Sequence, residues 1–88
     1  MAFEFDPHKA QTNWRKHRVR FEDAEPLFDD PMALTREDPD AAGEQRWLTV
    51  GGDALGRVLT VCYTLRGDDI RLISARLATK KERTHYES

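Results

Sequence analysis

The fold of this 88-residue chain is decided by its C-terminal stretch, DIRLISARLATKKERTHY, residues 69–86. Its first half alternates, which predicts a strand with one face formed by Ile70, Leu72 and Ser74 and the other by Arg71, Ile73 and Ala75. Thr79 followed by Glu82 is a capping box, which predicts that a helix begins there. The strand therefore runs directly into a basic helix, and Arg76 should lie near the cations of that helix.

Length and composition limit the chain to one domain with one modest core. Charged residues make up 34% and hydrophobic residues 39%. Neither an apolar run of roughly 20 residues nor a signal-peptide pattern is present, so we expect a cytoplasmic protein without membrane contact. The single cysteine, Cys62, lies between Val61 and Tyr63 and is expected to be a small buried residue rather than a nucleophile.

The charge is divided unevenly along the chain. Residues 1–56 carry seven Lys/Arg against twelve Asp/Glu (−5), and residues 57–88 carry seven against four (+3). This division suits a protein that meets RNA with a basic face and a basic protein with an acidic one, although a mixed solvated surface explains it equally well. The carboxylates expected to face a basic partner are Glu22, Asp23, Glu25, Asp29 and Asp30.

The N-terminal part predicts a short edge strand and two helices. The edge strand covers Phe3–Phe5, and Asp6-Pro7 is typical of a helix start, with a capping carboxylate before a proline. The first helix should pack through Ala10, Trp14 and His17, with Trp14 as a core anchor and Asn13 beside them. A second helix is predicted over Glu22–Phe28, packing Ala24, Leu27 and Phe28, with Pro26 tolerated near its start.

The middle of the chain predicts an antiparallel meander. Its expected parts are a weak strand over Met32–Thr35, a polar loop over Glu37–Gly43, an alternating strand over Gln45–Val50, a hairpin at Gly51, Gly52 and Gly56, a central strand over Arg57–Arg66 and a turn over Gly67–Asp69. The whole chain, residues 1–88, is therefore predicted to be one α+β domain: an antiparallel sheet with two N-terminal helices and one C-terminal helix.

The candidate chemistry is metal-free cleavage of RNA. His8, His17 and His85 lack the spacing of a metal site, and no glycine-rich phosphate loop precedes a helix, so we expect no cofactor. Metal-free cleavage needs a base for the 2′-hydroxyl, an acid for the leaving oxygen and cations for the developing charge. Side chains of the right types are Lys16, His17, Glu44, Arg66, Arg76, Glu82, Arg83 and Tyr86.

Structural explanations compete for most of these residues. His17 is favoured at the end of its helix by the helix dipole alone. Arg76 can instead be the ion-pair partner of Glu82 or Glu87, and Lys80 and Lys81 can form a solvated helix face.

Motifs along nearly the whole chain resemble those of the BrnT family of ribonuclease toxins. They are FEFDPHKA with Asn13 and Lys16-His17, FEDA with Phe28 and Asp30-Pro31, Glu44-Gln45-Arg46, Gly51, Gly56-Arg57, VCYT, Arg66-Gly67, ISARLA and ERTHYE. The resemblance implies a RelE-like fold and RNA cleavage without metal. It also implies a DNA-binding antitoxin of the BrnA type, in a hetero-oligomer that meets DNA only through the antitoxin.

We accordingly predict catalytic roles for Lys16, His17, Arg76, Glu82, Arg83 and Tyr86, and RNA-binding roles for Arg46, Arg66, Lys80 and Lys81. Two positions depart from the family pattern, because Arg18 replaces the usual glycine and Arg20 the usual serine-type cap. Two other functions remain open. One is a non-catalytic module whose acidic half binds a basic protein; the other, a nucleic-acid-binding regulator, is disfavoured because no DNA-reading helix is evident.

Overall fold

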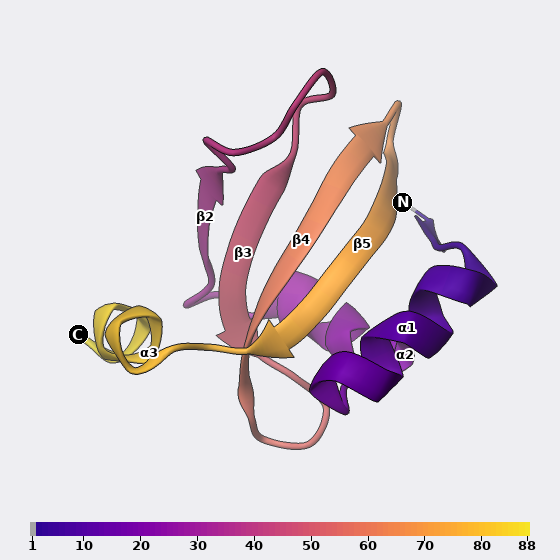
Figure 1. Cartoon of the computed structure of the whole chain (residues 1–88). Coiled ribbons are helices and arrows are strands. Elements are labelled where there is room, and N and C mark those ends of the chain that lie inside the picture. The colour runs from indigo at the N-terminus through magenta and orange to yellow at the C-terminus, as the bar shows by residue number, and fades with distance from the viewer. Residues whose placement is uncertain (1) are drawn as a thin grey trace.

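The computed structural model describes residues 2–88, which form one five-stranded sheet with helices around it (Figure 1). Its elements are β1 (Phe3–Glu4), α1 (Pro7–His17), α2 (Phe21–Ala24), the 3₁₀ helix η1 (Glu25–Asp29), β2 (Leu34–Glu37), β3 (Trp47–Gly52), β4 (Val58–Arg66), β5 (Asp69–Leu77) and α3 (Lys80–Glu87). The strand order is β1-β5-β4-β3-β2, so β4 lies at the centre as predicted. The α+β prediction is confirmed.

The sheet is mixed rather than purely antiparallel. Strands β2 to β5 form the predicted antiparallel meander, but β1 pairs in parallel with β5, with Phe3 opposite Ile70. No hairpin joins β1 to β5, because they stand at opposite ends of the sequence. Their relative direction is therefore free of the constraint that a short turn imposes.

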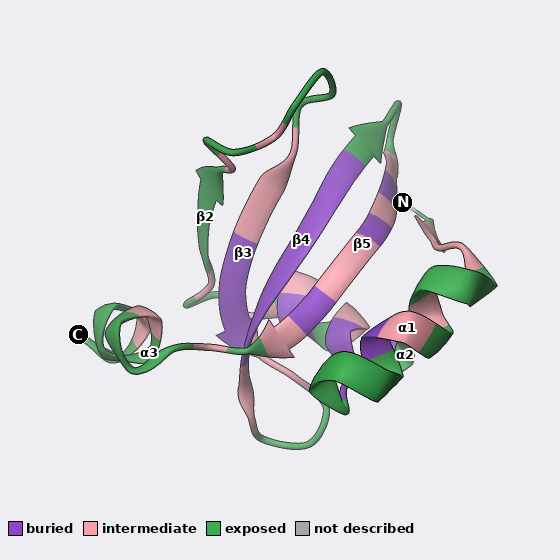
Figure 2. Ribbon diagram, in the orientation of Figure 1, coloured by how far each residue is buried: buried purple, intermediate pink, exposed green. Residues whose placement is uncertain are grey.

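One face of the sheet, here called the helix-packed face, holds the hydrophobic core. Most residues of the central strand β4 are buried (Figure 2). Val19, Phe21, Ala24 and Leu27 from the α1–α2–η1 region pack against β4 and β5. The strand residues of this core are Leu59, Val61, Tyr63, Ile70, Leu72 and Ala75. Alternation along the strands leaves the opposite face to more polar residues, and we call it the polar face.

Helix α1 starts as the sequence predicts and packs differently. The carboxylate of Asp6 accepts a hydrogen bond from the His8 N–H (2.8 Å), and Pro7 occupies the first turn. Trp14, however, is 37% exposed, so its prediction as a core anchor is wrong. Asn13 takes the buried position instead: its amide donates to the carbonyls of Val19 (3.0 Å) and Ala75 (2.9 Å) and accepts from the Ala75 N–H (2.9 Å).

The connection from α1 to α2 has arginines at two positions where other residue types are more stable: Arg18 has a left-handed backbone and Arg20 is a helix N-cap. Arg18 ends α1 in the left-handed conformation with φ 56°, which glycine adopts at less cost, by about 1 kcal/mol. Arg20 caps α2 and its side chain makes no capping hydrogen bond, whereas serine or aspartate there typically adds about 1 kcal/mol. The guanidinium carbons of both arginines lie over the Trp14 ring, 5.4 and 4.6 Å from its centroid.

The main differences from the predicted boundaries lie in the second helix and in strands β2 and β3. The second helix is one α-turn, starting at Phe21, that continues as η1 from Glu25, because Pro26 removes a helical hydrogen bond there. Strand β2 begins two residues later than expected, at Leu34. Gly51 and Gly52 both lie inside β3 rather than in the hairpin. A Cβ added to Gly51 would stand 3.0 Å from Cγ of Leu27. Close packing of η1 on the sheet, not a turn, therefore requires that glycine.

A β-bulge in β5 changes which residues share a face. Cys62 of β4 pairs with Ser74, but the next residue, Tyr63, pairs with Leu72, so Ile73 is the extra residue. Beyond the bulge Ala75 joins Ile70 in the core, while Ser74 and Arg76 turn to the polar face. The prediction that Ser74 shares a face with Ile70 and Leu72 is wrong for this reason.

Candidate active site

The site of interest lies where the polar face meets α3. Cross-strand pairing places Arg76 beside Thr60, Thr60 beside Val50, and Val50 beside Leu34. Helix α3 follows β5 and packs against β3. Its first turn therefore comes over the row of residues that contains Arg76.

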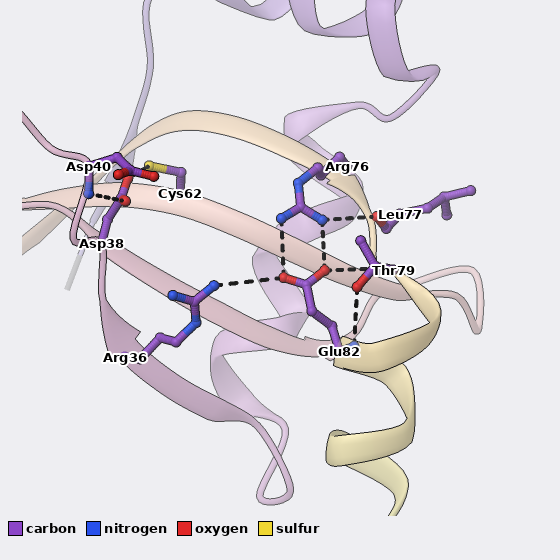
Figure 3. Close-up of polar contacts among 8 residues, drawn as sticks. All are labelled: Arg36, Asp38, Asp40, Cys62, Arg76, Leu77, Thr79 and Glu82. Atoms are coloured by element: carbon purple, nitrogen blue, oxygen red, sulfur yellow. Dashed lines mark hydrogen bonds and ion pairs between the residues drawn. The ribbon is translucent and has the colours of Figure 1, made fainter.

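Arg76 and Glu82 form the central ion pair (Figure 3). Nη1 and Nη2 of Arg76 donate to the two carboxylate oxygens of Glu82, at 2.7 and 3.1 Å, and Nη1 also approaches the Leu77 carbonyl at 3.3 Å. The same carboxylate closes the predicted capping box, accepting from the Thr79 N–H (2.8 Å) while the Thr79 hydroxyl accepts from the Glu82 N–H (3.1 Å). Glu82 thus fixes the start of α3 and the guanidinium together.

A second arginine reaches the same carboxylate. Nη2 of Arg36, on β2, lies 4.0 Å from Oε2 of Glu82, and its side chain is 57% exposed. Figure 3 shows Arg36 and Arg76 approaching Glu82 from two sides. Two cations therefore surround one carboxylate, which leaves the local charge positive.

This environment holds Glu82 in its charged form. The hydrogen bonds from Arg76 lower the pKa of Glu82 from 4.5 to about 2, against the opposing effect of burial. The same bonds raise the pKa of Arg76. Thr60 is also close enough to contribute to the lowering, although its buried hydroxyl makes no hydrogen bond of good geometry. A carboxylate with so low a pKa is a poor proton acceptor, so the geometry favours a positioning role for Glu82.

A groove of about 700 Å³ runs between α3 and the β2–β3 edge beside this pair. It is lined by Leu34, Thr35, Arg36, Val50, Thr79, Lys81, Glu82 and His85. Its size falls in the usual range for small-ligand sites, and its side chains include cations and an imidazole. The groove can hold an anionic segment next to the Arg76–Glu82 pair.

The structure brings only some of the predicted site residues together. Arg76 and Glu82 are in contact, and Lys81 lines the adjoining groove. Arg83 and Lys80 are exposed on α3. Lys16 and His17 are exposed at the end of α1, which packs along β5 rather than against α3.

Tyr86 has a structural partner. Its hydroxyl donates to the carboxylate of Asp30, which also accepts from the backbone N–H groups of Gly52 (2.9 Å) and Met32 (2.9 Å). These bonds, that from Tyr86 first, lower the pKa of Asp30, and the carboxylate raises the pKa of Tyr86. Tyr86 therefore ties α3 to η1 and β3.

Arg66, Cys62 and Arg46 make no hydrogen bond or ion pair with Arg76 or Glu82 within the described residues. Nη2 of Arg66 lies 4.0 Å from a carboxylate oxygen of Glu44, with both side chains half exposed. Cys62 is buried, and its thiol approaches the Asp38 carboxylate at 4.0 Å. Burial, and then that carboxylate, raises the pKa of the thiol, which agrees with the expectation that Cys62 is no nucleophile. The Nε of Arg46 is buried without a hydrogen-bond partner among residues 2–88.

Sequence reasoning missed Arg36 and His85 as parts of this site. Arg36 belongs to a short strand whose four residues are all exposed, and its approach to Glu82 follows from strand order, which no local motif encodes. His85 was considered only as a metal ligand, but its spacing of three from Glu82 puts both on one side of α3.

Within residues 2–88, no group of three or more His, Cys, Asp or Glu side chains is arranged to hold a metal ion. None of the helices in that part of the chain is long and apolar enough to span a membrane.

Comparison with known proteins agrees with the fold and the motifs. No curated protein sequence matches the chain. A solved structure, the 1.1 Å crystal structure of the Brucella abortus ribonuclease toxin BrnT, is similar with a TM-score of 0.70 and 26% sequence identity, covering 91% of this chain and 99% of that one. The sequence profile described as "Ribonuclease toxin, BrnT, of type II toxin-antitoxin system" matches residues 5–82. Since that match spans all but the two ends of the chain, the protein belongs to the BrnT family of type II ribonuclease toxins.

Proposed function

We propose that this toxin cleaves RNA without a metal ion on the polar face, with Arg76 binding the scissile phosphate. The observation that carries the proposal is the Arg76–Glu82 pair, whose Glu82 lines a groove together with Arg36 and Lys81. Its arginines supply the positive charge that a metal ion would otherwise provide.

Arg76 can hold Glu82 and a phosphate at the same time. Glu82 uses the end-on edge of the guanidinium, Nη1 and Nη2. The side-on edge, formed by Nε–H and the second Nη2–H, has no hydrogen-bond partner within the described residues. Arginine has five N–H donors, and its side-on edge matches two phosphate oxygens. Glu82 therefore orients the fork without blocking it.

The reaction is an internal transfer at phosphorus. The 2′-oxygen attacks the adjacent phosphorus, the bond from phosphorus to the 5′-oxygen breaks, and the products are a 2′,3′-cyclic phosphate and a 5′-hydroxyl. A base takes the 2′-hydroxyl proton and an acid returns one to the leaving oxygen. Arg76, with Arg36 as the second cation, stabilises the charge on the non-bridging oxygens.

Roles for the remaining predicted residues are part of the proposal. Arg83 acts as a further phosphate ligand from the first turn of α3, and Lys80, Lys81, Arg46 and Arg66 bind the flanking RNA. Proton transfer is assigned to an imidazole, because histidine titrates near neutral pH. His85 lines the groove whereas His17 lies on α1, so His17→Asn and His85→Asn should be compared. The variant whose pH–rate profile loses one limb identifies the histidine that transfers a proton.

The proposal is tested by cleavage of total RNA in EDTA. The wild-type toxin should remain active, Arg76→Ala should lose about 10²–10³ in rate, and Arg76→Lys should recover little because lysine lacks the fork. Thermal melts of the same variants show whether the fold persists. If the wild-type toxin loses activity in EDTA and a divalent ion restores it, the metal-free mechanism is refuted.

If the purified toxin cleaves no RNA but still binds a basic protein, the non-catalytic alternative is favoured instead. A well-folded Arg76→Ala protein that cleaves at the wild-type rate would end the proposed role of Arg76.

Membership in a type II toxin family implies an antitoxin partner. We propose a DNA-binding antitoxin of the BrnA type that meets the acidic surface of α2 and η1. Glu22 and Asp29 are exposed there and Asp23 and Glu25 are partly exposed, but Asp30 is occupied by Tyr86. Reversing Glu22, Asp23 and Asp29 should slow association at low salt more than it speeds dissociation. Unchanged association would make these charges a solubility feature.

A further inference from the structure

An exposed basic and aromatic cluster lies at the C-terminal end of α1. It consists of Trp14 with Arg18 and Arg20, and we call it the Trp14 cluster. Both guanidinium carbons lie within 5.4 Å of the ring centroid, so the two like charges are held close together. The ring face stabilises each cation, and this keeps both side chains in defined positions despite their exposure.

No carboxylate neutralises this cluster in the described chain. Residues 8–20 contain five Lys/Arg and no Asp or Glu. The ion pairs of residues 2–88 involve Arg36, Arg57, Arg66, Arg71 and Arg76, none of them from α1 or its C-terminal connection. The local surface is therefore strongly positive although the whole chain carries −2.

Local stability does not require arginine at either position. Arg18 has a left-handed backbone that glycine adopts more easily, and Arg20 stands at a helix cap where a small polar side chain would satisfy a backbone N–H. Two arginines at positions that the backbone disfavours converge on one exposed ring. A ligand that uses both guanidinium groups accounts for that convergence.

The cluster is mechanically linked to the proposed active site. Asn13, next to Trp14, makes three hydrogen bonds, two of them to the backbone of Ala75, the residue before Arg76. These bonds are buried, so α1 and the end of β5 are held in a fixed relation. A ligand that binds the cluster is therefore attached to the same rigid unit that carries Arg76.

We infer that the Trp14 cluster is a second binding site for RNA, in which Arg18 and Arg20 contact the phosphate backbone and a base stacks on the part of the Trp14 ring that is exposed. Proteins commonly bind single-stranded nucleic acids with cationic groups beside an aromatic ring, because the strand offers both phosphates and bases that stack. An acidic protein could pair its carboxylates with Arg18 and Arg20, but it has no bases to stack on the Trp14 ring. The inference rests on the proposed function, because it assumes that RNA is the substrate.

The test uses a single-stranded RNA that cannot be cleaved, about 12 nucleotides long and 2′-O-methylated throughout, so that binding is measured without catalysis. Fluorescence anisotropy at several salt concentrations gives affinity and its salt dependence for Arg18→Gly, Arg20→Ser and Arg71→Ser. Arg71 is the matched control, because it also loses one cation but pairs with Glu4 near β1. Each cluster variant should bind several-fold more weakly, and its slope of log K against log salt should fall by about 0.7.

Thermal melts accompany the binding data. Arg18→Gly relieves the left-handed strain, so its melting temperature should be equal to or above that of the wild type, which separates lost binding from lost folding. If wild-type toxin binds the RNA and both cluster variants bind it with unchanged affinity and slope, the inference is overturned while the proposed function stands. If the variants lose antitoxin binding alone, the cluster is a protein interface and the inference is equally overturned. A wild-type toxin that neither binds nor cleaves RNA would refute both.

Discussion

Replacing Glu82 by glutamine tests the ion pair at the centre of the proposed site. Glutamine keeps a side-chain oxygen for the capping box, so the change mainly removes the charge that faces Arg76. A pKa lowered from 4.5 to about 2 corresponds to about 3 kcal/mol of stabilisation. The Glu82 side chain is only 16% exposed, so solvent screening removes little of this. We expect Glu82→Gln to lower the free energy of unfolding by about 2–3 kcal/mol at neutral pH.

The pH dependence identifies the cause of that loss. Because the pKa of Glu82 is lower in the folded protein than in the unfolded one, its contribution is complete above pH 4.5 and disappears as the pH falls from 4.5 to about 2. Urea denaturation of the wild type and of Glu82→Gln at several pH values across this range should show the difference shrinking toward zero. Glu87→Gln, an exposed change on the same helix, is the control and should show a small, flat difference.

Two results would refute the reasoning. A wild-type advantage that is constant between neutral pH and about pH 3 would mean that the charge of Glu82 contributes nothing to stability. A Glu82→Gln toxin that is destabilised but cleaves RNA at the wild-type rate would show that orienting Arg76 is unnecessary for catalysis.

Three further changes test how the fold supports the site. Gly51→Ala places a Cβ about 3.0 Å from Leu27 and should destabilise by roughly 1–3 kcal/mol in thermal melts; an unchanged melting temperature would mean that η1 moves freely. Asn13→Ala leaves backbone groups of Val19 and Ala75 buried without partners and should cost on the order of 3 kcal/mol by urea titration, whereas a loss below about 1 kcal/mol would mean that water replaces the amide. Cys62→Ala should cleave RNA at the wild-type rate, because burial keeps the thiol protonated; a large loss of rate would assign it a chemical role.

Features that depend on a few neighbouring residues were predictable from the sequence. The Asp6-Pro7 helix start and the Thr79–Glu82 capping box are each closed by hydrogen bonds within three residues, and both are present. The apolar segment around Val61 was correctly identified as the central strand, because only a strand buried on both faces is so continuously apolar.

The errors come from contacts between distant parts of the chain. Helical periodicity assigns Trp14 to the core, but Asn13 occupies the buried position of α1. Its amide forms hydrogen bonds there with buried backbone groups of Val19 and Ala75. Gly51 was read as a turn residue because its real constraint, Leu27 of η1, is 24 positions away in sequence.

The site was predictable in part. Arg76 and Glu82 share one local motif, so their proximity was expected, and the structure confirms the contact between them. Arg36 was not expected there, because its nearness to Glu82 depends on β2 pairing with β3 and on α3 packing against β3.

The bulge at Ile73 decides which face of the sheet Arg76 reaches. If residues 69–77 formed a regular strand of the same length, strict alternation would put Arg76 on the same side as Ile70 and Leu72, within the hydrophobic core. Deleting Ile73 would instead close the bulge and leave Arg76 opposite Thr60, on the polar face. A change that straightens β5 with all its residues retained would therefore reverse the direction of the proposed phosphate ligand, although every functional side chain would still be in the sequence. A comparison of toxins that lists only conserved residues would overlook such a change.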